Sequence, residues 1–296
     1  MHIKESKGDR VTKILCYVFV GLFALACLLP LLLVLSVSLS SESAVVQHGY
    51  SILPQEFSLG TYKYIFQHSG AKILRSYGVT LFITIVGTLM ATAVTAMIAY
   101  ALSIKKLRYR NVISFLCNFT IVFSAGLIPW YMVSTNVLGL KDSIWALILP
   151  SVFSVWNMFL LRTYFSAISP SLYEAAILDG ANYFQIFWRI TVPLSKTTLL
   201  TIGMMYALAF WNDWWNALMF INSKDLFPLQ YYLYNILSNV NAISSGRIPA
   251  GATGVQLPAE TVKMAVTMIT IGPIIFLYPF VQKYFVNGIM TGAVKE

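Results

Sequence analysis

The sequence predicts an all-α protein that crosses a membrane several times, and two observations lead to this. Of its 296 residues, 58% are hydrophobic and only 10% are charged, whereas a soluble domain carries about 25% charged residues. The apolar residues also gather into runs of about 20 residues or more, which is the length that a helix needs to cross a bilayer. We therefore expect one transmembrane domain over 1–296, with no room for a large soluble domain.

Six apolar runs are separated by polar or basic segments. The predicted spans cover residues 14–39, 79–104, 112–134, 143–161, 199–221 and 263–285. The first run follows a basic segment, as in a signal peptide, but it is longer than the roughly 7–15 apolar residues of a signal peptide core. We expect it to be retained as a span.

The second and third spans carry helix-specific signals. Small residues recur along the second span at spacings of three and four, and they are Gly87, Ala91, Ala93, Ala96 and Ala99. Such spacing lets helix backbones approach closely, so this span is expected to pack inside a bundle. Gly126 and Pro129 predict a break in the third span. Before the second span, residues 57–66 are expected to form a short amphipathic helix.

The distribution of Lys and Arg predicts the orientation in the membrane. Basic residues concentrate before the first span, in the turn at 105–110 and in the loop at 162–198. These segments lie on the same side if the chain crosses six times, and basic residues mark the cytoplasmic side. Both termini and the central loop are therefore predicted to be cytoplasmic. We attribute the net charge of +9 to basic residues in cytoplasmic loops, which is favoured over nucleic acid binding.

The sequence lacks the usual signatures of catalysis. It has no GxxxxGK[ST] phosphate-binding loop and no HExxH zinc motif, so we expect neither an ATPase site nor a metal site in this chain. The three cysteines, Cys16, Cys27 and Cys117, fall inside apolar runs without disulfide or metal spacing, and they behave as small hydrophobic residues.

The central loop at 162–198 predicts a helix, a bend and a second helix. Ser169 followed by Pro170 is a favourable helix start, and Ser171 with Glu174 offers a capping box one step later. Gly180 permits a sharp change of direction. The pattern fits either an amphipathic helix on the membrane surface or an element that docks a partner protein.

The second half of this loop is expected to form a short amphipathic helix. Phe184, Phe187 and Trp188 share one face by their spacing of three and four. Pro193 is expected to interrupt the helical path before the fifth span begins.

The loop resembles the EAA motif of ABC-importer permeases. The matching residues are Glu174-Ala175-Ala176, Asp179-Gly180-Ala181, Phe187, Ile190 and Pro193-Leu194. Their form is similar to the carbohydrate branch of MalG-like and LplC/YtcP-like permeases, and the similarity covers nearly the whole chain. Thr197 is a departure, because many members have a second proline there.

This resemblance implies a type I ABC importer permease fold in a bacterial cytoplasmic (inner) membrane. The loop would form coupling helices in a cleft of a cytoplasmic ATPase dimer, which binds ATP and Mg, so this chain needs no cofactor. The family further implies a homologous second permease and an extracytoplasmic solute-binding protein. Glu174 would face a basic residue of the ATPase, and Gly180 would supply the bend. The coupling residues carried over are Glu174, Ala175, Ala176, Asp179, Gly180, Ala181, Phe187 and Pro193.

A polar and aromatic segment interrupts the fifth span. It comprises Trp211, Asn212, Asp213, Trp214 and Trp215. A carboxylate within the membrane costs about 3 kcal/mol unless it is paired or faces water. The segment is therefore a candidate for the substrate pathway, and the alternative is a belt of tryptophans at the membrane interface.

The resemblance implies an oligosaccharide as substrate. The outward-facing segments carry slightly more basic than acidic residues, which is compatible with an acidic sugar chain such as a uronate oligosaccharide. The alternatives are an ABC permease for another small polar solute, an ATP-independent carrier or channel, and an intramembrane hydrolase. An intramembrane hydrolase needs paired catalytic groups, and no other predicted span supplies a carboxylate to pair with Asp213.

Overall fold

The structure, a computed structural model, describes residues 7–244, 260–273 and 275, which are helical or connect helices apart from an isolated bridge between Ser40 and Phe57. The chain divides into two units. The first comprises Met1–Ala71 and Asn235–Pro273, and the second comprises Lys72–Tyr234 and Ile274–Glu296. The predicted all-α class is confirmed for the described residues.

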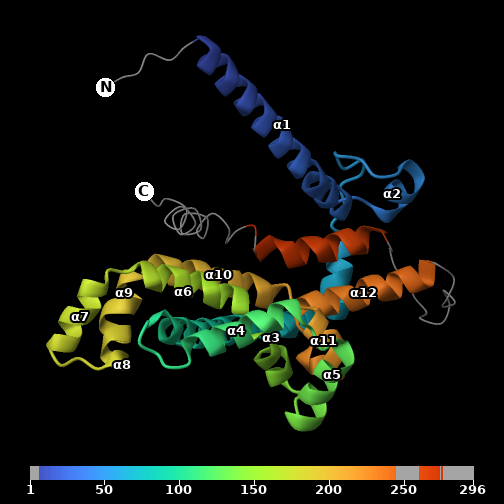
Figure 1. The fold of residues 1–296 in the computed structure, drawn as a ribbon. Helices are drawn as coiled ribbons and strands as arrows, with labels where there is room; N and C mark the ends of the chain where they lie inside the picture. The colour runs from blue at the N-terminus through green and yellow to red at the C-terminus, as the bar shows by residue number, and fades with distance from the viewer. Residues whose placement is uncertain (1–6, 245–259, 274, 276–296) are drawn as a thin grey trace. The chain divides into compact units, whose positions relative to one another are not determined.

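The first unit begins with α1 (Lys7–Ser38), which contains nearly all of the predicted first span (Figure 1). Most of its large apolar side chains from Val11 to Leu35 are exposed. Within the described residues, Arg10–Ser38 and Gly60–Ser103 are long and apolar enough to cross a membrane, and two bent helix pairs raise the number to four if each is one span. The first half of the predicted sixth span, 263–273, is part of a helix at 260–273, and nearly all of the rest lies outside the described residues.

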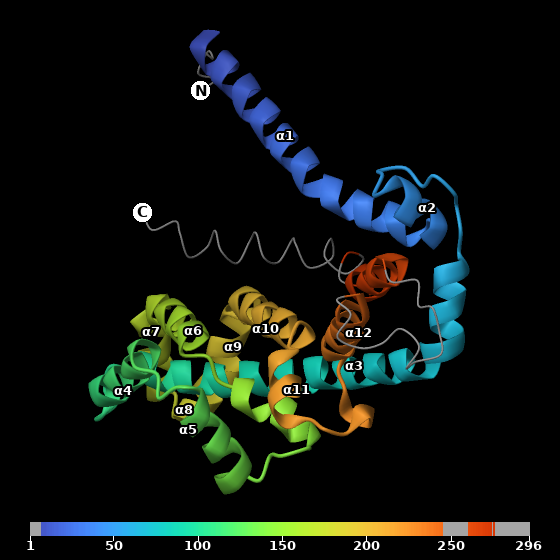
Figure 2. The same ribbon diagram turned by 90° about the vertical axis from the view of Figure 1, so that its right-hand side faces the viewer.

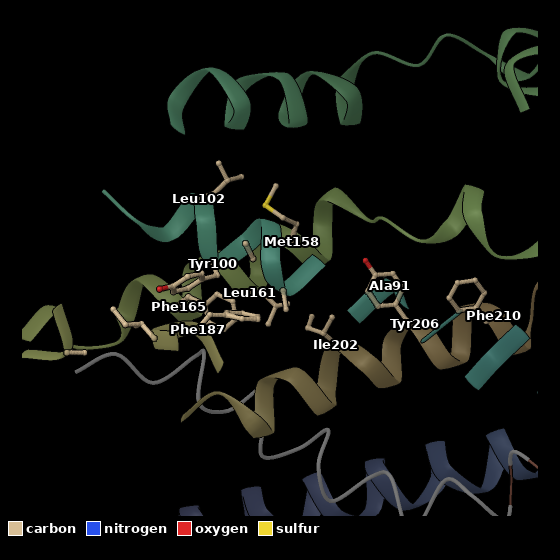
Figure 3. Packing of buried hydrophobic residues seen from close by; sticks show 14 residues of the cluster. Ala91, Tyr100, Leu102, Met158, Leu161, Phe165, Phe187, Ile202, Tyr206 and Phe210 are labelled. Carbon is tan, nitrogen blue, oxygen red and sulfur yellow. The ribbon is translucent and has the colours of Figure 1, made fainter. Parts of the chain in front are cut away.

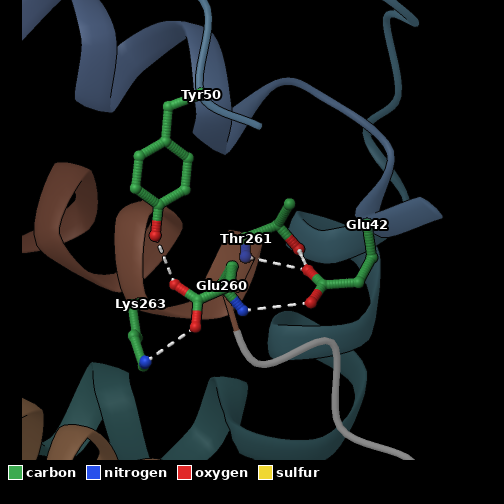
Figure 4. Close-up of polar contacts among 5 residues, drawn as sticks. All are labelled: Glu42, Tyr50, Glu260, Thr261 and Lys263. Carbon is green, nitrogen blue, oxygen red and sulfur yellow. Dashed lines mark hydrogen bonds and ion pairs between the residues drawn. The ribbon is translucent and has the colours of Figure 1, made fainter. Parts of the chain in front are cut away.

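A carboxylate caps a helix in the first unit (Figure 4). Glu42, the first residue of α2 (Glu42–His48), accepts hydrogen bonds from the backbone N–H groups of Glu260 and Thr261, at 3.1 and 2.9 Å. These residues begin the helix at 260–273, and a carboxylate at a helix N-terminus satisfies donors that lack partners within the helix. Glu260 in turn accepts hydrogen bonds from Tyr50 at 2.5 Å and Lys263 at 2.9 Å.

The predicted amphipathic helix at 57–66 is wrong as a separate element. α3 (Gly60–Ser103) begins there and continues without a break through the predicted second span. No proline lies between 60 and 103, and a helix tolerates isolated glycines at a modest cost, so nothing ends the first turns before the apolar run starts.

The small residues of α3 pack as predicted, with one exception. Ala91, Ala96 and Ala99 are buried, whereas Ala93 is exposed. A Cβ atom added to Gly87 would lie 2.8 Å from the ring of Phe210, so only glycine admits that close approach.

The predicted third, fourth and fifth spans are all interrupted. α4 (Arg110–Val122) is followed by α5 (Leu127–Met132) and a π-helical turn (Val133–Val137), and the two halves are bent by 117°. The expected break at Gly126 is confirmed by its positive φ of 89°. The fourth segment consists of 3₁₀ turns (Ile144–Leu147, Leu149–Ser151) and α6 (Val155–Ala167). The fifth consists of α10 (Lys196–Trp211) and α11 (Trp215–Phe220).

The remaining elements of the second unit are the loop helices described below, a 3₁₀ turn (Lys224–Leu226) and α12 (Leu229–Ser244), which runs on into the first unit. α6 extends past the predicted end of the fourth span, because no helix breaker stands before Ser169-Pro170. Figure 2 shows α6 and α10 beside each other, in agreement with their contacts.

One buried cluster holds the second unit's helices together (Figure 3). α3 contributes alanines and Tyr100, α6 contributes larger side chains, and α10 contributes Tyr206. The Tyr206 hydroxyl shares a hydrogen bond with Thr95 at 2.6 Å and accepts the backbone N–H of Ser154 at 2.9 Å. Two residues of the central loop, Ile186 and Phe187, belong to the same cluster. The loop is thus anchored directly in the helix bundle.

Candidate functional site

The central loop forms a helical hairpin, as predicted. α7 (Pro170–Leu178) is followed by α8 (Tyr183–Ile186), a π-helical turn (Phe187–Thr191) and α9 (Val192–Leu194). Ser169 is the N-cap and Pro170 the first helical residue. The alternative capping box of Ser171 with Glu174 is wrong, because the helix has already begun, and Ser171 instead shares a 2.8 Å hydrogen bond with Ser169.

The bend between the helices is closed by the backbone. The N–H of Gly180 donates to Ile177 at 3.0 Å, and the N–H of Ala181 donates to Ala176 at 2.9 Å. This is the Schellman arrangement, which requires a residue with positive φ directly after the helix. Gly180 has a φ of 83°, so the bend predicted at this glycine is confirmed. Because the last carbonyls of α7 are satisfied internally, the turn keeps its shape without a partner.

The start of α8 has a cap that sequence reasoning missed. The Asn182 side chain accepts the backbone N–H of Gln185 at 2.8 Å, and the Gln185 side chain accepts the backbone N–H of Asn182 at 2.9 Å. An Asn followed three residues later by Gln is a recognisable variant of the capping box. The signal was therefore present in the sequence.

The three aromatic residues of the second helix contact one another, as expected for residues on one face. The ring centroid of Trp188 lies 6.2 Å from that of Phe184 and 5.1 Å from that of Phe187. Their exposure differs, because Phe187 is buried against Tyr100, with 5.1 Å between ring centroids, whereas Phe184 is 68% exposed and Trp188 is 50% exposed.

The helical path is interrupted before the fifth span, as predicted, but the turn falls two residues after Pro193. α9 ends at Leu194, Ser195 forms the turn, and α10 begins at Lys196.

The hairpin exposes large apolar side chains and a carboxylate. Leu178 is 87% exposed, and Phe184 and Trp188 are exposed as well. Glu174 is also exposed and lines a cavity of about 250 Å³ with Lys105 and Lys106 of the basic turn. Exposed apolar side chains together with a charged residue are typical of a protein interface.

Tyr173 connects α7 to the second half of the hairpin by a hydrogen bond. Its hydroxyl shares a 3.3 Å hydrogen bond with Thr191, and burial raises the pKa of Tyr173. The side chain is therefore neutral at physiological pH. The contact joins α7 to the π-helical turn, whose Phe187 belongs to the buried cluster with residues of α3 and α10.

The aromatic segment of the fifth span is a capped helix break. Asp213 accepts the backbone N–H of Asn216 at 3.0 Å and the Asn216 amide at 2.6 Å, and that amide also donates to Ser151 at 3.1 Å. The carboxylate thus caps α11 and, through Asn216, holds the break against the fourth segment. Asn216 was missed in the sequence, although Asp and Asn at a spacing of three suggest such a cap.

The tryptophans of this segment differ in exposure. Trp211 is buried, and its indole N–H has no hydrogen-bond partner among the described residues. Trp214 and Trp215 are 37% and 42% exposed, and Trp214 stacks on Tyr234 with 4.8 Å between ring centroids. Asn212 is exposed and donates to Leu208 at 2.8 Å. Trp214, Trp215 and Tyr234 therefore offer an open aromatic surface.

Comparison with known proteins decides the family. Residues 3–291 match the model of the binding-protein-dependent transport system inner membrane component. The chain belongs to this family. The permease is 37% identical over 287 residues to the polygalacturonan/rhamnogalacturonan transport system permease protein YtcP of Bacillus subtilis, covering 97% of this chain and 99% of the relative. It is also 36% identical to the protein LplC of the same organism, over 98% and 97% of the two chains.

A solved structure supports the same assignment. The permease matches a chain in the crystal structure of a bacterial ABC transporter involved in the import of the acidic polysaccharide alginate, with a TM-score of 0.83 and 34% identity. The match covers 96% of the permease and 99% of that chain. The resemblance to carbohydrate ABC permeases is therefore confirmed, and the chain is a membrane transport subunit.

The two predicted sites of the permease, the hairpin and the aromatic segment, are separate in the structure. Glu174, Ala175, Asp179 and Gly180 are exposed on the hairpin, whereas Ala176 and Phe187 are buried beneath it. The aromatic segment follows at the other end of α10, whose 16 residues span about 24 Å at 1.5 Å per residue.

Proposed function

We propose that this permease is one transmembrane subunit of an ATP-driven importer that moves an oligosaccharide across the bacterial cytoplasmic membrane. The proposal includes six spans with both termini in the cytoplasm. Its partners are a homologous second permease, an ABC ATPase dimer that binds ATP and Mg, and an extracytoplasmic solute-binding protein. The full-length similarity to YtcP and to the alginate importer subunit carries this proposal.

The hairpin of α7 and α8 is the surface that we assign to the ATPase. Its exposed apolar residues and Glu174 are available to a partner, and its turn is held by its own backbone. A guanidinium of the ATPase would bind the Glu174 carboxylate through charge-assisted hydrogen bonds. Phe187 lies beneath, within the bundle, and transmits the movement. Its role is to position the hairpin, since a buried ring does not touch the partner.

ATP binding would close the ATPase dimer and move the hairpins of both permeases. A movement of α7 reaches α3 and α10 through the buried cluster around Phe187. The transport path then alternates between open-inward and open-outward states, and the ligand-loaded binding protein shifts that equilibrium by binding one state more tightly.

The substrate class that we propose is an oligosaccharide with carboxylate groups. The relative named for polygalacturonan and rhamnogalacturonan and the importer of the acidic polysaccharide alginate support this class. The exposed faces of Trp214, Trp215 and Tyr234 suit the apolar faces of sugar rings.

Uptake of labelled trigalacturonate into proteoliposomes tests the proposal. The permease would be purified with its partner permease and ATPase, and the binding protein would be added outside. We expect uptake that requires both ATP and the binding protein. Uptake at the same rate without ATP would identify a carrier and contradict the proposal.

A further inference from the structure

α4 carries a polar stripe that α6 covers only in part. Asn111, Ser114 and Asn118 follow one another at spacings of three and four and therefore lie on one face of the helix. α4 has no buried residue. The amides of Asn111 and Asn118 are exposed and have no hydrogen-bond partner among the described residues. Amides that face lipid are costly, so a polar ligand or water is expected at this face.

The stripe lines a groove between α4 and α6, which contact each other. A hollow of about 480 Å³ is lined by the three polar residues together with Phe115 and Phe159. A second hollow, of about 320 Å³, adjoins it, because Phe159 lines both. Its other lining residues are Arg110, Arg162, Thr163, Ser166 and Ala167. We call these two hollows together the α4–α6 groove.

Two guanidinium groups at one end of the groove have no carboxylate partner among the residues that the structure describes. Arg110 donates to the carbonyl of Leu102 at 2.8 Å, and Arg162 donates to Ser114 at 2.9 Å. Each guanidinium has five N–H donors, so most donors of both groups remain available to an anion.

The groove arranges its groups along a line. Arg110 and Asn118 are eight positions apart on α4, which corresponds to about 12 Å at 1.5 Å per residue. Hydroxyls and amides follow from the charged end toward the interior of the predicted third span, and two phenylalanine rings line the same wall. Amides and hydroxyls suit a polyhydroxylated ligand, and guanidinium groups suit a carboxylate.

We propose that the α4–α6 groove is a substrate subsite on the cytoplasmic half of the transport path. Arg110 and Arg162 bind a uronate carboxylate, and the amides of Asn111 and Asn118 bind sugar hydroxyls. Ser114 donates to the carbonyl of Arg110 at 2.6 Å and accepts from Arg162 at 2.9 Å, so it positions the guanidinium of Arg162. This subsite rests on the proposed function, because it takes the acidic oligosaccharide as cargo. An anionic lipid headgroup would use the arginines but leave the amides deeper in the groove without partners, so the polar stripe favours the sugar.

The test combines Arg110→Gln with Arg162→Gln, and separately Asn111→Ala with Asn118→Ala, in the assembled transporter. Losing hydrogen bonds to a charged group weakens binding roughly tenfold or more. We therefore expect trigalacturonate uptake to fall at least about tenfold in the arginine pair, while ATPase activity stimulated by the loaded binding protein stays near wild type. Matched controls are Arg108→Gln, which changes a basic residue outside the groove, and Thr120→Ala, which changes a polar residue of α4 outside it.

Vesicle composition separates the sugar from a lipid. The uptake defect of the arginine pair is expected to be equal in phosphatidylcholine vesicles with and without phosphatidylglycerol. A defect that disappears without the anionic lipid, or wild-type uptake by both variant pairs, would overturn the subsite. If the wild-type complex shows no ATP-dependent uptake of trigalacturonate, the proposed function fails instead. If the stimulated ATPase is lost together with uptake, the groove acts in coupling and the subsite is overturned.

Discussion

At the scale of single residues, Gly180 shows most clearly how a local backbone requirement serves the hairpin. Its φ of 83° closes the Schellman turn, and no atom lies within 4 Å of a Cβ added at this position. A substitution there would therefore act through backbone strain alone.

We predict that Gly180→Ala lowers the free energy of unfolding by about 1 kcal/mol, the usual cost of a left-handed conformation for an alanine. Gly180→Asn should cost less, because asparagine tolerates this conformation. Thermal unfolding of the purified protein in detergent measures both. The matched control is Gly78→Ala, a helical glycine that also has open space around its Cβ, which should be neutral or stabilising. Equal destabilisation at both positions would refute the explanation.

Glu260 is a second residue whose environment has a measurable consequence. Hydrogen bonds from Tyr50 and Lys263 hold the pKa of Glu260 below its usual value of 4.5, and the bond to Glu260 raises the pKa of Tyr50 to about 12. A lowered carboxylate pKa contributes stability that is present above pH 4.5 and is lost as the pH falls through the lowered value.

We predict that acid lowers the stability of the first unit partly by protonating the Glu260 carboxylate. Between pH 5 and pH 3, thermal unfolding of the wild type should shift to lower temperature more steeply than that of Glu260→Gln, which has no charge to lose. Tyr50→Phe should reduce the acid slope as well, because it removes the largest cause of the shift. Parallel pH profiles for the three proteins would contradict this account.

At the scale of elements, the hairpin divides into buried residues that hold it and exposed residues that we assign to a partner. Phe187 is 4% exposed, whereas Phe184 is 68% exposed. We predict that Phe187→Ala costs about 3 kcal/mol of stability, as for a buried aromatic residue. Phe184→Ala should change stability by less than about 0.5 kcal/mol but should weaken ATPase stimulation. Unfolding and ATPase assays on the two variants separate the roles, and a large stability loss at Phe184 would contradict the division.

Helices with simple signals were predicted well from the sequence. The first span, the start of the hairpin at Ser169-Pro170, the bend at Gly180 and the break at Gly126 depend on local propensity or on glycine geometry. Those signals lie within a few residues of the feature that they specify.

The errors occurred where an apolar run hides a helix break or where an interaction is not local. The apolar run at 199–221 concealed the helix break that Asp213 caps. Contacts between elements, such as Arg162 with Ser114, leave no pattern in a single sequence.

At the scale of the whole molecule, we propose that the interrupted helices and the hairpin act together in transport. The bent pairs at 110–137 and 144–167 place helix ends within apolar segments, and irregular backbone at such depth is tolerated where it faces protein or water. Asn118 lies on the first of these pairs, and Asp213 lies in the break between α10 and α11. In the mechanism that we propose, the hairpin links these segments to the ATPase.

The most direct test of that link is ATPase activity of the assembled transporter, stimulated by the substrate-loaded binding protein, with Glu174→Lys in the permease. Reversing this exposed charge opposes binding to a basic residue of the ATPase. Ser171→Lys, which places a positive charge one turn earlier on α7, is the control. The account predicts that Glu174→Lys inserts and folds normally but loses most stimulated ATPase activity and uptake, while Ser171→Lys retains both. Wild-type stimulation and uptake in Glu174→Lys would contradict it.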